Sequence, residues 1–195
     1  MSLYVDPPFS LGETLGVSSA DDGKYWVGVV KVFPDVDPTT GKVRSGRLKK
    51  CVAVRNSSAG ALLPKRVVQF AGTGTALFSE VTGYSAVTNT ELVGVVDEFL
   101  PTAGVAVNDV FWVTVDGPTE VAVALSGTDV AVGDRISAVT AASSGSTTAG
   151  RVGPSPLSAS TAGANNNGRG VIGYAASAGA TTGSAVLALI RSAVA

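Results

Sequence analysis

The sequence contains no histidine, and its 195 residues include a single cysteine. Histidine is the commonest general base and metal ligand, and it activates the nucleophile in Ser-His and Cys-His pairs. Cys51 alone cannot form an internal disulfide. These absences lower the expectation of catalysis, so we predict that the chain is not an enzyme and binds no metal or cofactor.

Charge and long apolar runs are also scarce. Charged residues make up 15% of the chain, and 14 Lys and Arg against 15 Asp and Glu give a net charge of −1. Without a concentrated positive surface, nucleic acid is not an expected partner. No apolar run reaches the ~20 residues of a membrane-spanning helix. The first residues lack the basic start and apolar core of a secretion signal, which predicts synthesis in the cytoplasm.

Short strands dominate what is present. We find no stretch that combines helical apolar spacing with freedom from Gly and Pro. Runs rich in Val, Ile, Thr and aromatic residues, each bounded by turn-forming residues, occur at 25–33, 49–54, 66–70, 92–96, 110–115, 120–125, 135–139, 170–175 and 185–190. This pattern predicts an all-β fold, a small barrel or sandwich of short strands.

Three stretches share a pattern of apolar residues, a two-residue corner and then a strand. The corners are Pro64-Lys65, Asn108-Asp109 and Gly133-Asp134. All contain residues suited to tight turns, while their charges differ. We therefore interpret Asp134-Arg135 as turn geometry and not as an acid-base pair. Asp134 is expected to bond local backbone amides, and Ile136 and Val139 to reach the core.

A second repeated pattern in the sequence suggests an internal duplication. Leu-Val-Gly-Val-Val at 92–96 and Val-Ile-Gly-Tyr-Ala at 171–175 each place a glycine inside an apolar strand, a common sign of a bulge or bend. Corner, glycine-containing strand and apolar strand follow one another twice along the chain. This order predicts two related β lobes.

Low-complexity segments and proline set the predicted domain limits. Residues 140–150 and 158–168 have the composition of exposed loops. Residues 1–23 contain Pro7 and Pro8 and few core-type runs, which predicts an extended N-terminal arm that orders on contact with something else. A β-rich domain is expected over 24–195, divided into lobes at 24–125 and 126–195.

Motifs that resemble active or binding sites have simpler explanations. The adjacent carboxylates Asp97 and Glu98 point to opposite faces of a strand, unlike the facing pair of a hydrolase. The acidic run at 35–41 has its glycine one place late for a calcium loop and lacks the closing Glu, so a β-turn is favoured. Cys51 is predicted to be a small, half-buried strand residue.

One basic cluster stands out, formed by Lys42, Arg44, Arg47, Lys49 and Lys50. It fits a solvated face or a charge-protected edge strand. It fits equally well a surface that docks onto an acidic protein.

From residue 92 onward the chain resembles the small β-rich capsid cement, or decoration, proteins of tailed bacteriophages. The likeness rests on "VAVNDVFWVTV", "VAVGDRISAV" and "GRGVIGYAASAGATTGSAVLALI". It covers about half of the chain, and the first 50 or so residues have no counterpart. The resemblance implies a virion protein, made in the host cytoplasm, that forms trimers on the outer capsid surface and clamps the major capsid protein.

The resemblance implies that the N-terminal arm touches the capsid, and the charge of the basic cluster makes it a second candidate contact. The predicted contacts come from the arm and the basic cluster: Leu3, Tyr4, Val5, Pro7, Pro8, Phe9, Arg44, Arg47, Lys49 and Lys50. The alternative hypothesis is a head fibre or adhesin-like module that binds carbohydrate or another surface. In that case Trp26, Trp112 and Tyr84 would be stacking platforms.

Overall fold

The computed structural model describes residues 6–16, 26–71, 78–84, 93–124, 129–138, 150–154, 171–179 and 184–191. Within these ranges the fold is all-β, as predicted, and contains no helix. The strands are β1 Val30–Val36, β2 Val43–Asn56, β3 Val67–Phe70, β4 Glu80–Gly83, β5 Val93–Val96, β6 Val110–Ala122, β7 Arg135–Ala138, β8 Val152–Pro154, β9 Val171–Ala175 and β10 Ala185–Arg191.

All ten strands belong to one sheet, in the order β1-β2-β4-β3-β5-β6-β10-β9-β7-β8 with an additional β2–β6 pairing. That pairing closes a partial ring of β2, β4, β3, β5 and the first half of β6, which we call the first ring. The parallel β2–β4 contact joins only Arg55 to Glu80 and Asn56 to Val81, so the ring is not a regular barrel.

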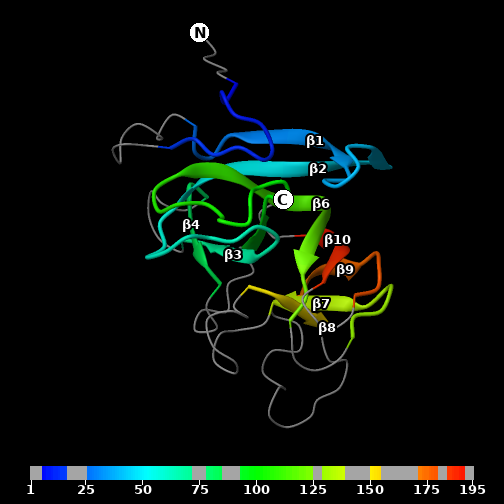
Figure 1. Cartoon of the computed structure of the whole chain (residues 1–195). Helices are drawn as coiled ribbons and strands as arrows, with labels where there is room; N and C mark the ends of the chain where they lie inside the picture. The colour runs from blue at the N-terminus through cyan, green and yellow to red at the C-terminus, as the bar shows by residue number, and fades with distance from the viewer. Residues whose placement is uncertain are drawn as a thin grey trace.

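A second ring repeats the first. It contains the last part of β6, then β10, β9, β7 and β8, and a parallel bridge between Val123 and Val152 closes it. In Figure 1, β1 and β2 lie at one end of the molecule and β7 and β8 at the other, with β6 running between them. β6 ends at Ala122, before the predicted boundary at 125/126, and this strand belongs to both rings.

The two rings match in register as well as in strand order. In the first, Val68 pairs with Gly94 and Gly83; in the second, Ile136 pairs with Gly173 and Pro154. Equivalent positions also point inward, because alternate residues of a strand share a face. The matched buried pairs are Val68 and Ile136, Val81 and Val152, Phe111 and Val186, and Val115 and Ile190. The duplication seen in the sequence is therefore a duplication of structure.

Gly94 and Gly173, the glycines of the second repeated pattern, lie where a neighbouring strand leaves little room for a side chain. A Cβ on Gly94 would lie 2.1 Å from Val113 Cγ1, and one on Gly173 would lie 2.0 Å from Leu189 O. A register shift beside Gly173 marks the expected bulge, whereas the β3–β5 ladder shows no shift at Gly94. At Gly173 a side chain would push two strands apart, whereas at Gly94 it would displace the side chain of Val113.

The three corners are the same turn. Each begins at a residue that makes an isolated bridge, has a left-handed residue three places later, and starts a strand five places after the bridge. The left-handed residues are Lys65 (φ 60°), Asn108 (φ 72°) and Gly133 (φ 88°). Their amides donate to Val96 O, Asn56 O and Ala175 O, in each case the last residue of the neighbouring strand.

Asp134 behaves as a turn residue, as predicted. Its Oδ2 accepts a hydrogen bond of 2.8 Å from the amide of Ala131. Ile136 is fully buried, and Val139 lies outside the described residues.

Several strand limits differ from the sequence prediction. β1 begins at Val30, because residues 26–28 form a turn that is closed by a hydrogen bond of 3.2 Å from the Val29 amide to Trp26 O. The two strands predicted at 110–115 and 120–125 are one strand, β6, which passes through Gly117 with a φ of 97°. A Cβ there would meet Leu48 O at 2.5 Å, so glycine lets β6 pass from one ring to the other. The short strands β4 and β8 were not predicted.

Candidate partner-contact site

The predicted arm residues divide into three groups. Leu3, Tyr4 and Val5 lie outside the described residues. Pro8 is exposed, while Pro7 and Phe9 are buried. The described part of the arm therefore packs on the body of its own chain, and the role of these residues in a partner contact stays a prediction.

Three contacts hold residues 9–15 against the first ring. The rings of Phe9 and Trp112 lie 5.1 Å apart, and Trp112 Nε1 donates to Phe9 O at 3.2 Å. The amide of Gly12 donates to Asp97 Oδ2 at 2.5 Å. Leu15 and Val110 exchange two backbone hydrogen bonds of 2.8 and 3.0 Å. The arm seals the outer face of β2 and β6 around Cys51, Ala53 and Trp112.

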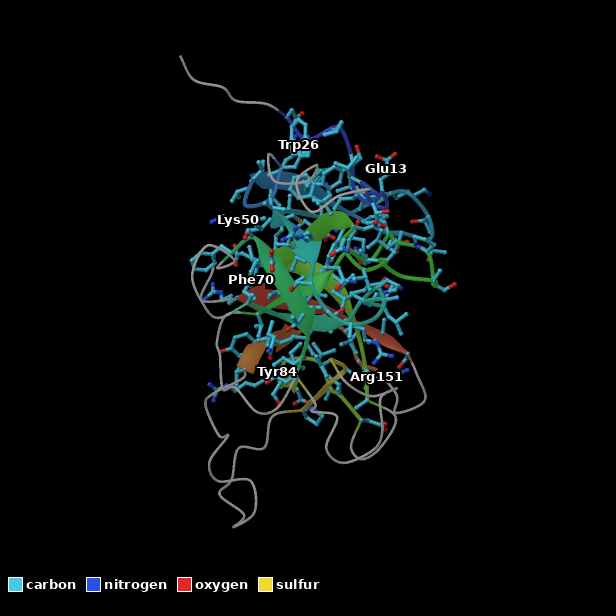
Figure 2. The ribbon with its side chains drawn as sticks, turned by 90° about the vertical axis from the view of Figure 1, so that its left-hand side faces the viewer. Glu13, Trp26, Lys50, Phe70, Tyr84 and Arg151 are labelled. Carbon is cyan, nitrogen blue, oxygen red and sulfur yellow. The ribbon has the colours of Figure 1, made fainter. Side chains whose placement is uncertain are left out.

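The basic cluster also divides, because it lies on β2 and alternate strand residues face opposite ways. Arg47 is exposed and Lys50 is partly exposed, whereas Lys49 is fully buried. A register shift between Pro34 and Val36 on β1 reverses the alternation, so that Arg44 turns inward and Val43 is 66% exposed. Figure 2 shows Lys50 at the edge of the molecule.

Arg44 and Lys49 belong to a buried charge cluster centred on Glu98. Lys49 Nζ lies 2.6 Å from Glu98 Oε1, and Arg44 Nη2 lies 2.8 Å from the same oxygen. Glu98 Oε2 accepts a hydrogen bond from the Glu120 amide at 3.0 Å. The cluster ties the β1–β2 hairpin to the end of β5 and to β6.

The outer members of the cluster complete the charge balance. Arg44 also pairs with Asp35 at 2.8 Å and with Glu120 at 3.2 Å, and Lys65 Nζ lies 2.6 Å from Glu120 Oε2. Three cations thus face the carboxylates of Asp35, Glu98 and Glu120. Buried charges of this kind are tolerated when they are paired and hydrogen-bonded. These carboxylates serve the packing of the hairpin and are not free for acid-base chemistry.

Burial favours the neutral form of two titratable groups beside the cluster, because it raises the pKa of each. Burial raises the pKa of Asp97 above its ordinary value, against the opposing effect of hydrogen bonds from the Gly12 and Phe99 amides. Burial raises the pKa of Cys51 to about 12. Cys51 is completely buried, more so than the half-buried residue predicted, which makes its thiol unreactive in the folded state.

The opposite side of the β1–β2 hairpin is apolar and exposed, and we call it the hairpin face. Val30 and Val32 of β1 are 44% and 54% exposed, and Leu48 of β2 is 62% exposed. Val32 pairs with Lys50, and exposed Pro34 pairs with Leu48, which places all of them on one side of the ladder. The sequence signal that could have located this face is the alternation Val-Lys-Val-Phe-Pro at 30–34.

A groove of about 490 Å³ adjoins the hairpin face at Leu48. Its walls come from β2 on one side and from β9 and β10 on the other. The lining residues are Arg47, Leu48, Asp116, Gly117, Tyr174, Leu189, Ile190 and Arg191. Tyr174 is 44% exposed there.

Other candidate sites have structural roles in the described residues. Asp37 Oδ1 accepts hydrogen bonds from the Thr39 and Thr40 amides, both 2.8 Å, which form the predicted turn and lower the pKa of Asp37. No group of three His, Cys, Asp or Glu that could hold a metal occurs in the part of the chain that the structure describes. Over the same part, no helix is long and apolar enough to cross a bilayer.

The predicted stacking platforms are largely covered. Trp112 is fully buried between Phe9 and Phe33, whose ring lies 5.3 Å away. Trp26 packs against the same cluster, and Tyr84 packs against the core of the second ring. Figure 2 shows Trp26 at one end of the molecule, with Tyr84 and Arg151 toward the opposite end. These three aromatic residues do not form one surface.

Comparison with known proteins gives one structural likeness. No protein-family model matches the sequence, and no curated protein matches it. The structure is similar to the head fibre gp8.5 N base of bacteriophage phi29, with a TM-score of 0.40 and 20% identity over 72% of this chain and 92% of that one. At these values the likeness does not establish a common fold or function.

Proposed function

We propose that the chain is a structural protein of a tailed-phage head and not an enzyme. In this role it binds subunits of the major capsid protein on the outer surface of the capsid and stabilises the shell. The sequence resemblance to decoration proteins supports this proposal. The principal structural support is the doubled scaffold, in which two rings of the same register are joined by a shared strand.

A doubled scaffold suits a lattice of repeated subunits. Each ring presents the same backbone framework, so one chain has two related platforms on which contacts to neighbouring subunits can be built. Linked contacts gain affinity by avidity even when each is weak. We propose further that the chain assembles as a homotrimer, which would multiply this effect at a threefold position of the lattice.

Co-sedimentation tests the proposal. Purified chain is mixed with expanded heads that lack it, prepared from the phage whose genome encodes it, and the mass of the free chain is measured by light scattering. A trimer that binds in many copies per head is the expected result. A monomer that stays in the supernatant would contradict the proposal. Saturation at a few copies per head would instead favour the head-fibre hypothesis.

A further inference from the structure

The hairpin face is unpartnered in the chain itself. β1 pairs with β2 and, among the residues that the structure describes, with no other strand. The most exposed large apolar side chains of the hairpin, Val32, Val43 and Leu48, are between 54% and 66% exposed. The other side of the same hairpin, which carries Lys49 and Cys51, is covered by the arm and the charge cluster. Several large exposed apolar side chains on one hairpin are typical of an interaction site.

The groove extends this surface around the edge of β2. Leu48 contributes to both, and Tyr174 of β9 also lines the groove. Gly117, Leu189 and Ile190 also line the groove, together with the charged residues Arg47, Asp116 and Arg191, so a recess of mixed polarity lies beside the apolar hairpin face. A partner side chain can therefore be buried in the groove while the flanking residues cover the hairpin face.

The charges around this surface indicate what kind of partner fits. Lys42, Arg47, Lys50 and Arg191 surround it, and none of these four makes an ion pair with another described residue. Asp116 is the acidic residue of the groove. The surface is thus basic on a chain whose net charge is −1. A second copy that presented the same face would bring like charges together, whereas an acidic surface would be attracted.

We propose that the hairpin face and its groove bind an acidic, apolar segment of the major capsid protein. An apolar side chain of that segment occupies the recess beside Leu48 and Tyr174, and its carboxylates pair with Arg47 and Arg191. This inference rests on the proposed function and identifies its contact surface. It retains Arg47 and Lys50 among the residues predicted from the sequence and assigns Arg44 and Lys49 to the interior.

Single substitutions on the full-length chain test the apolar part. Leu48→Glu places a charge in the centre of the surface, and binding to heads should weaken by about tenfold or more, as at an interface hot spot. Val132→Glu is the matched control, because Val132 is 68% exposed and precedes β7 in the other ring. The control should bind as the unsubstituted chain does. Thermal melting of both variants confirms that they are folded.

Paired substitutions test the charge. Arg47→Glu with Arg191→Glu should weaken binding to heads by about tenfold or more, and Arg47→Lys with Arg191→Lys should retain most of it. Binding of the unsubstituted chain should also weaken as salt is raised, because exposed charges are screened. Binding that is indifferent to charge reversal and to salt would overturn the acidic character of the partner segment.

The outcomes separate this inference from the proposed function. If the unsubstituted chain binds heads and Leu48→Glu binds equally well, the surface is wrong and the function stands. If the unsubstituted chain does not bind heads, the function fails and this inference fails with it. If Leu48→Glu converts an oligomer of the free chain into a monomer, the hairpin face is a contact between copies and the capsid assignment is overturned.

Discussion

At the scale of single residues, backbone geometry decides more positions than chemistry does. Lys65, Asn108 and Gly133 differ in charge and size but share a left-handed backbone and one hydrogen-bond pattern. The sequence revealed these corners because turns select Gly, Pro, Asn and Asp through local sterics. It did not reveal that each corner caps a neighbouring strand, since Asn56 precedes Asn108 by more than fifty residues.

Gly173 provides a direct test of close strand approach. Gly173→Ala should lower the free energy of unfolding by about 3 kcal/mol, because the new Cβ would lie against the backbone oxygen of Leu189. Gly46→Ala is the control, since no atom lies within 4 Å of a Cβ built there, and its effect should stay within about 0.5 kcal/mol. Urea denaturation measures both. Equal stability of the two variants would show that β9 and β10 separate easily.

Asp97 should give the chain a pH dependence of a definite sign. Its pKa is raised in the folded state, so between its ordinary value of 3.8 and the raised value the folded chain binds more protons than the unfolded one. Stability therefore decreases as pH rises through that interval. Asp97→Asn should remove this part of the pH dependence of the unfolding free energy. An unchanged profile in the variant would mean that burial does not perturb the carboxyl group.

At the scale of elements, the β1–β2 hairpin shows what the sequence could not predict, namely on which side of the hairpin each basic residue lies. Alternation along a regular strand would place Arg44 on the same side as Leu48 and Lys50. The register shift opposite residues 44–47 reverses this pattern, and Arg44 and Lys49 meet the same oxygen of Glu98. Such a shift depends on contacts with β5 and β6, which no local pattern reports. The packing of the arm was missed for the same reason, because it depends on a contact between Phe9 and Trp112, which lie far apart in the sequence.

The charge cluster predicts that substitution of Lys49 destabilises the fold far more than substitution of Lys42, another lysine of the basic cluster. Lys49→Met should cost about 3 kcal/mol of unfolding free energy, because it leaves Glu98 buried with one cation fewer. Lys42→Met is the control: Lys42 is exposed, and the effect should stay within about 0.5 kcal/mol. Chemical denaturation of both proteins measures the difference. Similar stabilities would indicate that water reaches Glu98 in the folded chain.

At the scale of the whole molecule, one strand, β6, belongs to both rings. Length and composition alone could not predict this connection. The sequence predicted most strands and their repetition, because glycine and corner signals are local. It placed a break near residue 117, where the structure has one continuous strand. The partner surface was predicted only in part, because the division of the basic cluster depends on the hairpin shift.

A shared strand predicts one cooperative unfolding transition. Val121→Ala, on the second-ring half of β6, should destabilise the chain by about 2 kcal/mol through lost burial. Hydrogen exchange should then accelerate equally for the slowest amides of β3 in the first ring and of β7 in the second. Val132→Ala, on an exposed side chain, should change neither. Faster exchange confined to β7 would show that the rings open separately.

Sharing β6 also determines how the molecule carries a load. Two lobes connected by a linker can bend at the linker, but here β10 lies beside β6 in a continuous ladder from the Ala185–Ala122 pair to the Arg191–Asp116 pair. A pull applied to one ring along β6 reaches the other as shear across this ladder, where the hydrogen bonds resist together. We therefore expect the two rings to resist extension as one body, with no hinge between them.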